Sequence, residues 1–252
     1  MTMEGYKTLV VLRHGIYKRN HRENAKGVAA REAAKTKHNP RDDYDRLGLD
    51  NEGKGQIRLA RAKLAMAVNA FDLCLSSPYL RARESADIVV GDKLDIVLDQ
   101  NLRERDLGDF VEIPSEIFYQ DYKESAAQKI ANPLDWLPKN GETLRQTGAR
   151  ALLAVKRAEN FENHETVLFS AHADIAISLR SRPEFGGLTT PKKLKTPLCD
   201  AIPNPQKIQN AQFDIYTRED PTWGKTYPGV AFFRSIAPTG TPFDTGWLKI
   251  KR

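Results

Sequence analysis

The chain has 252 residues, enough to bury a sizeable core in one α/β domain. Its 39 Lys and Arg residues against 33 Asp and Glu residues give a net charge of +6. That excess suits an anionic substrate but is too diffuse to indicate nucleic-acid binding. No apolar stretch reaches membrane-spanning length, no signal-peptide pattern is present, and the two cysteines, Cys74 and Cys199, lack metal-site spacing. We therefore expect a cytoplasmic protein with no membrane or nucleic-acid partner, no metal and no cofactor.

The first predicted strand ends in two residues that can carry chemistry. Leu9 to Leu12 is a short apolar run, β-branched in its middle, which is typical of a buried strand. Arg13, His14 and Gly15 follow it directly. Because ligands of open α/β sheets bind beyond the carboxyl ends of the strands, Arg13 and His14 are candidates for a binding site.

A polar segment rich in Lys and Arg, residues 18–46, comes next. One interpretation is a solvated surface insertion, which we slightly favour. The other is a basic lid that attracts phosphorylated substrates. After this insertion, residues 50–69 carry apolar side chains at helical spacing and predict an amphipathic helix.

A second strand is predicted over Phe71 to Leu75, and a helix after it brings another arginine to the same edge. Ser77 is a good N-cap residue and Pro78 suits the first helical position, so that Arg81 falls in the first turn. A third strand, residues 94–98, leads into a charged loop over residues 101–108.

The remaining elements complete an alternating α/β pattern. Helices are predicted around residues 114–130 and from residues 141–143 onward, and Thr166 to Phe169 forms a fourth strand with His172 just after it. Two closing strands are predicted over residues 211–216 and 230–236. No internal repeat and no domain boundary is evident in the sequence.

Three predicted strand ends therefore present Arg13 with His14, Arg81 and His172, and the charged loop adds Glu104. Guanidinium groups match phosphate oxygens in bidentate geometry and stay charged at any working pH. A neutral imidazole can attack phosphorus, and a carboxylic acid can protonate the leaving group. If the strands are parallel neighbours, these groups form a pocket for phosphoryl transfer.

The sequence resembles the histidine phosphatase superfamily, the phosphoglycerate-mutase-like enzymes. Seven stretches carry the resemblance in the family's order: LRHG (12–15), Asn20, LDNEGKGQ (49–56), SSPYLRARESA (76–86), LRERDLGDF (102–110), NGET (140–143) and VLFSAHAD (167–174). A weaker match, QNAQFDIY (209–216), resembles the family's late strand.

The resemblance implies a three-layer α/β/α sandwich with a mainly parallel central sheet. Residues 1–252 would then form a single catalytic domain with a basic insertion at about residues 18–46. It also implies an enzyme that acts on a small phosphorylated substrate. Because no cluster of Asp, Glu, Cys and His residues has metal-site spacing in the sequence, we expect this enzyme to be metal-independent.

Site roles follow from the same resemblance. It implies that His14 is the nucleophile that becomes phosphorylated and that Glu104 is the proton donor to the leaving group. The phosphoryl group would be held by four residues: Arg13, Asn20, Arg81 and His172. Asp106 and Glu112 lie close to Glu104 in the sequence and are alternative acids.

Three residues depart from the family pattern beside the expected pocket: Ile16, Tyr17 and Ala173. Because these residues border the expected pocket, the resemblance does not identify the substrate. We favour a phosphatase that works through phosphohistidine, with a phosphoglycerate-mutase type of phosphoryl transfer as the alternative. A non-catalytic phospho-ligand binding protein is a third possibility, although a binder would not need the nucleophile.

Overall fold

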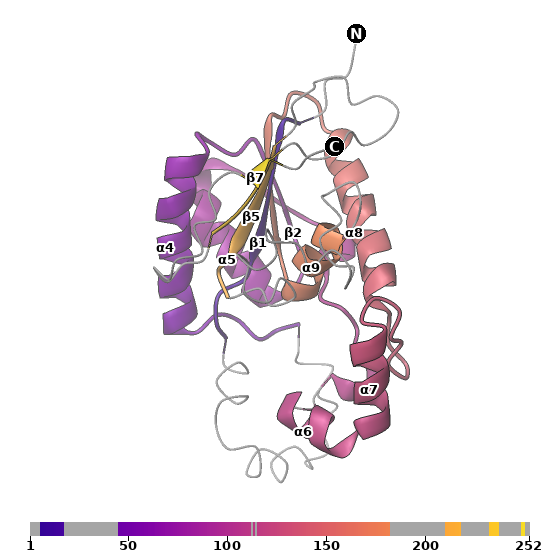
Figure 1. Ribbon diagram of the computed structural model, residues 1–252. Helices are drawn as coiled ribbons and strands as arrows, with labels where there is room; N and C mark the ends of the chain where they lie inside the picture. The colour runs from indigo at the N-terminus through magenta and orange to yellow at the C-terminus, as the bar shows by residue number, and fades with distance from the viewer. Residues whose placement is uncertain are drawn as a thin grey trace.

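A β-sheet forms the middle layer of the protein in this computed structural model (Figure 1). The structure describes residues 6–17, 45–111, 113, 115–181, 210–217, 232–236 and 248–249. Within these ranges lie seven strands: β1 (Thr8–Arg13), β2 (Leu73–Ser76), β3 (Ile96–Leu98), β4 (Thr166–Ala171), β5 (Phe213–Thr217), β6 (Phe232–Ile236) and β7 (Leu248–Lys249). Their order across the sheet is β3-β2-β4-β1-β5-β6-β7.

The first four strands along the chain make the parallel part of the sheet. β4 pairs in parallel with both β1 and β2, and β2 pairs in parallel with β3. The later strands extend the sheet in antiparallel fashion, with β5 on β1, β6 on β5 and β7 on β6. The two predicted closing strands are thus confirmed as β5 and β6.

Helices cover both faces of the sheet. The described helices are α4 (Asn51–Ala67), α5 (Leu80–Val90), α6 (Ser115–Asp121), α7 (Lys123–Ala131), α8 (Leu144–Glu159) and α9 (Ala173–Ser181). Figure 1 shows α4 and α5 on one side of the sheet, and α8 and α9 on the other. This arrangement confirms the predicted three-layer α/β/α fold.

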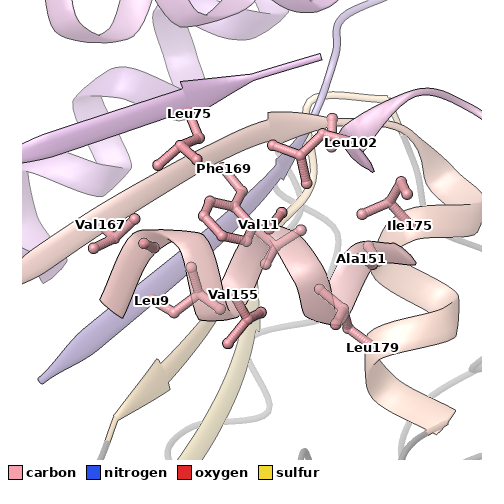
Figure 2. Close-up of a cluster of buried hydrophobic side chains, with 14 of the residues drawn as sticks. Leu9, Val11, Leu75, Leu102, Ala151, Val155, Val167, Phe169, Ile175 and Leu179 are labelled. Atoms are coloured by element: carbon pink, nitrogen blue, oxygen red, sulfur yellow. The ribbon is translucent and has the colours of Figure 1, made fainter. Parts of the chain in front are cut away.

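β1 contributes to both halves of the core because its side chains alternate between the two faces of the sheet. Leu9 and Val11 pack with α8 and α9, whereas Val10 and Leu12 pack with α4 and α5. Figure 2 shows the first of these clusters, in which Phe169 of β4 lies among side chains from the strands and helices. Each large aliphatic side chain buried in this way stabilises the fold by roughly 1.5–3 kcal/mol.

Side-chain caps determine where the two long helices begin. Asp50 accepts a hydrogen bond from the backbone N–H of Gly53 at 2.7 Å and starts α4, close to the predicted position. Thr143 and Gln146 form a capping box at the start of α8. Such caps satisfy backbone N–H groups that have no partner within the helix.

Two helix predictions are wrong in detail. α5 begins at Leu80, with Tyr79 as its N-cap residue, so Ser77 and Pro78 lie before the helix. The predicted helix over residues 114–130 forms two helices, α6 and α7, because the backbone of Tyr122 leaves helical geometry between them. The Tyr122 ring packs against those of Phe110 and Phe118, and these contacts accompany the break.

Not every prediction about the chain's organisation falls on described residues. Residues 18–44, most of the basic insertion, lie outside them. The single-domain organisation stays a prediction. None of the helices formed by the described residues has the length and apolar character needed to cross a membrane.

Candidate active site

The candidate site lies at the carboxyl ends of three neighbouring parallel strands. β1 ends at Arg13 opposite Ala171 of β4, so His14 and His172 follow paired residues. Ser76 of β2 pairs with Ser170 on the other side of β4, and Ser77 follows it. The strand register thus brings together the chain segments that the sequence predicts to meet.

His14 is buried, with 2% of its surface exposed, and its two ring nitrogens have different partners. Nδ1 lies 2.7 Å from the carbonyl oxygen of Gly15, which can only accept, so Nδ1 carries the ring proton. Nε of Arg81 donates to Nε2 at 3.2 Å. Burial, together with the charges of Arg81 and Arg13, holds the pKa of His14 well below its usual value. The imidazole is therefore neutral, with its lone pair on Nε2.

Gly15 allows the loop after β1 to approach α4 closely. A Cβ atom at this position would overlap the carbonyl oxygen of Gly53 in the first turn of that helix. The N–H of Gly15 donates to Oγ of Ser85 at 3.3 Å, and that hydroxyl donates to the carbonyl oxygen of Arg81 at 2.7 Å. The loop that carries His14 is thus tied to both helices on this face.

Arg81 is fully buried, and its guanidinium lies close to two tyrosine rings. Its Cζ atom is 4.7 Å from the ring centroid of Tyr17 and 4.9 Å from that of Tyr79. Tyr17 also meets the His14 ring edge-on, with centroids 5.3 Å apart. Sequence reasoning noted Tyr17 as a departure from the family but missed this contact with two of the predicted site residues.

His172 is fully buried beside His14, with ring centroids 5.1 Å apart. Its Nε2 atom lies 2.8 Å from Oγ of Ser77. Ser77 Oγ also accepts the backbone N–H of Tyr79 at 3.3 Å. Ser77 therefore contacts a candidate catalytic histidine instead of capping α5, which explains why that prediction is wrong.

Glu104 faces the same histidine from the charged loop. Its Oε2 atom lies 3.9 Å from Nδ1 of His172, and Oε1 accepts the backbone N–H of Arg105 at 2.9 Å. Burial and the nearby carboxylate of Asp174 raise the pKa of Glu104 to about 7, although the Arg105 N–H and the charges of Arg81 and Arg13 oppose the change. Only 17% of the side chain is exposed. This carboxyl group can hold a proton near neutral pH.

The other candidate acids are placed differently. Asp106 uses Oδ1 to accept the N–H of Gly108 at 2.7 Å, which stabilises the turn after the loop. Glu112 lies outside the described residues, as does Asn20, the further phosphate contact implied by the resemblance. Of the predicted site, the structure brings together five residues: Arg13, His14, Arg81, Glu104 and His172.

Sequence reasoning missed the residue that holds the loop. Arg150 of α8 donates to the backbone carbonyl oxygens of Asn101, Arg103 and Glu104 at 2.6–3.1 Å. It also pairs with the carboxylate of Glu142. In the sequence, the one pointer to this contact was its partner Glu142, which belongs to the NGET stretch (140–143).

Arg105 and Asp174 form a second contact behind Glu104. Arg105 is buried and donates to the carbonyl oxygens of Glu142 and Trp136, each at 2.9 Å. Its Nη1 atom lies 3.9 Å from Oδ2 of Asp174, in the first turn of α9. Within the described residues, no group of three or more His, Cys, Asp or Glu side chains could hold a metal ion.

The sequence that carries these groups matches a known protein family. The sequence model of the histidine phosphatase superfamily (branch 1) matches residues 9–199. The chain belongs to this superfamily. The match confirms the predicted family. The matched range includes the five candidate site residues that the structure brings together: Arg13, His14, Arg81, Glu104 and His172.

Proteins similar to this histidine phosphatase superfamily enzyme include a mutase and two phosphatases. A 2,3-bisphosphoglycerate-dependent phosphoglycerate mutase from Brucella melitensis is 27% identical over 68% of this chain and 85% of its own. The crystal structure of the alpha-ribazole phosphatase from Shigella flexneri has a TM-score of 0.59 at 18% identity, over 85% of this chain and 92% of that one. The structure of a mycobacterial glucosyl-3-phosphoglycerate phosphatase has a TM-score of 0.57 at 21% identity, over 84% of this chain and 92% of that one. The two structures show that the fold is shared.

Proposed function

We propose that this enzyme is a phosphatase that hydrolyses small phosphomonoesters through a covalent phosphohistidine on His14. The observation that carries the proposal is the neutral imidazole of His14, with its Nε2 lone pair turned toward Arg81. A nucleophile for phosphorus needs such a lone pair and a nearby cation that binds the phosphoryl oxygens.

In the first step, Nε2 of His14 attacks phosphorus and the bond from phosphorus to the ester oxygen breaks. Arg13 and Arg81 bind the equatorial oxygens, on which negative charge is spread in the transition state. The proton of the Glu104 carboxyl group goes to the departing alkoxide. A carboxyl group with a pKa of about 7 suits this role, because it is protonated at neutral pH and still acidic enough to donate.

In the second step, water attacks the phosphohistidine from the side that the alcohol has left. The Glu104 carboxylate takes a proton from this water, the bond from phosphorus to Nε2 breaks, and orthophosphate forms. His14 recovers its lone pair and Glu104 its proton. Each residue thus returns to its starting state after one turnover.

The proposal includes independence of metals, because the arginines can supply the positive charge that a metal ion supplies in other phosphoryl-transfer sites. The similarity in fold to two phosphatases supports hydrolysis. The sequence similarity to a phosphoglycerate mutase supports the alternative, in which the phosphoryl group passes to a bound phosphoglycerate instead of water.

A hydrolysis screen separates the two reactions. Purified enzyme is offered a panel of phosphomonoesters with and without EDTA, and 3-phosphoglycerate isomerisation is assayed in parallel. We expect orthophosphate release that survives chelation. Isomerisation faster than any hydrolysis would favour the mutase, and loss of turnover with EDTA followed by rescue with a divalent ion would contradict metal independence.

The intermediate can be trapped directly. Acid-labile, base-stable label should appear on the wild-type protein after a reaction with labelled ester is quenched, and none on His14→Ala. Turnover of His14→Ala should fall by about 1,000-fold or more, since loss of a covalent nucleophile removes a whole step. Wild-type turnover or label in this variant would contradict the assignment of His14.

A further inference from the structure

We propose that the Ser77 hydroxyl fixes the tautomer of His172, so that the imidazole presents an Nδ1–H donor to the phosphoryl group. Ser77 is then a positioning residue that acts through His172. The inference rests on the proposed function and extends it to a residue that the resemblance does not assign.

The hydrogen bonds of Ser77 leave one place for its proton. A hydroxyl has one hydrogen to donate and two lone pairs. The backbone N–H of Tyr79 donates to Oγ at 3.3 Å and uses one lone pair. Among the described residues, the only acceptor within hydrogen-bond distance of this hydroxyl is Nε2 of His172, at 2.8 Å. Because Ser77 is fully buried, its proton has no access to water and belongs in that hydrogen bond.

The proton of the neutral imidazole must then reside on Nδ1. Burial, together with the charge of Arg81 and those of His14, Arg150 and Arg13, holds the pKa of His172 well below its usual value. A neutral ring carries a single proton, so a hydrogen bond accepted at Nε2 places that proton at Nδ1.

Nδ1 of His172 is buried, and no hydrogen-bond acceptor lies within reach of it in the described part of the chain. Buried donors without a partner are rare because they cost free energy. Oε2 of Glu104 is 3.9 Å away, and the ring meets that of His14 edge-on, with centroids 5.1 Å apart. The donor is therefore close to both the proposed nucleophile and the proposed acid, where an oxygen of the transferred phosphoryl group can accept from it.

The opposite tautomer would work against catalysis. With the proton on Nε2, the Ser77 hydroxyl proton would lose its acceptor, and a lone pair on Nδ1 would face the phosphoryl oxygens and Glu104. That lone pair would repel the anionic group and could accept the Glu104 proton, which the leaving group needs. A histidine held in the wrong tautomer is known to reduce turnover severely in other enzymes.

The tautomer can be read from nitrogen NMR of the full chain labelled with ¹⁵N-histidine, without substrate. The signals of His172 are those lost in His172→Gln. We expect a protonated Nδ1 and an unprotonated Nε2 in the wild type and in Ser77→Thr, and a mixed or reversed state in Ser77→Ala. A wild-type spectrum with the proton on Nε2, or an unchanged spectrum in Ser77→Ala, would overturn the proposal.

Binding of orthophosphate, measured by calorimetry, tests the function of the donor. Ser77→Ala should weaken it by about 10-fold, the loss of one hydrogen bond to a charged acceptor, and Ser77→Thr should restore most of it. Ser178→Ala is the matched control, since Ser178 is a buried serine that donates to the backbone carbonyl of Ile175 in α9.

Equal phosphate affinity in Ser77→Ala and wild type would overturn the donor role. Neither the NMR measurement of the tautomer nor the calorimetric measurement of phosphate binding depends on turnover. An enzyme with the expected tautomer and phosphate affinity that hydrolyses no phosphomonoester would contradict the proposed function and leave the Ser77 assignment standing.

Discussion

The two sides of the candidate site are held in place by different means. On the side proposed to bind the phosphoryl group, the phosphoryl side, His14 and His172 follow directly from β1 and β4, and main-chain pairing places them next to each other. On the side proposed to protonate the leaving group, the leaving-group side, Glu104 lies in a loop that Arg150 holds through three carbonyl oxygens. Substitutions on the first side should therefore affect binding and attack. Substitutions on the second should affect the proton that the leaving group receives.

The largest expected effect on the leaving-group side comes from Glu104→Gln. Loss of the acid should reduce phosphorylation by alkyl phosphates about 100- to 10,000-fold. For an activated aryl phosphate, measured as a burst, the loss should be smaller because that leaving group needs less proton assistance. Asp106→Asn is the matched control and should change neither rate much. If it reduced the alkyl rate more than Glu104→Gln does, Asp106 would be the acid.

Removing the support of the loop tests whether Glu104 must be held. Arg150→Met should lower kcat by about 10- to 100-fold and weaken orthophosphate binding much less, since small displacements of a catalytic group have costs of this size. Arg145→Met is a suitable control because Arg145 is also on α8 but pairs with Asp135 in solvent. Equal effects of the two substitutions on kcat would mean that Arg150 has no special part in placing Glu104.

On the phosphoryl side, the ring of Tyr17 can be replaced by a smaller aliphatic side chain. Tyr17→Leu should weaken orthophosphate binding about 5-fold, because a buried guanidinium loses a cation–π contact. Tyr17→Phe keeps a ring and should bind almost as well as wild type. Equal losses in Tyr17→Phe and Tyr17→Leu would assign the effect to the hydroxyl, which both variants lack, and not to the ring.

The smallest effect is a shift in pH dependence. Glu104 must be protonated to donate, and its pKa is about 7, so kcat/KM should fall as the pH rises above this value. Asp174→Asn removes a negative charge that favours the protonated form. The alkaline limb should then move to lower pH. Asp92→Asn changes an exposed residue in the short 3-10 helix Gly91–Lys93, outside the site, and should leave the limb in place. An unmoved limb in both variants would contradict the role of Asp174.

The contrast between the two sides also explains what the sequence could predict. His14 and His172 come at the ends of apolar runs, so strand geometry alone predicted their meeting. Arg150 lies 46 residues from Glu104 along the chain, and no short-range pattern links them. Ser77 was misassigned because a serine before a proline matches a helix start equally well, and only the tertiary fold shows that His172 competes for its hydroxyl.

The hydrogen bond from Arg81 to His14 has a consequence for selectivity. In the unliganded enzyme the Nε2 lone pair already accepts a hydrogen bond, so the imidazole is a weak nucleophile at rest. A phosphate dianion is a stronger acceptor for the guanidinium than a neutral imidazole and should free the lone pair, whereas an uncharged ester or anhydride of similar size offers only weaker, neutral acceptors. In the proposed mechanism, the reactivity of His14 should therefore depend on the charge of the incoming molecule.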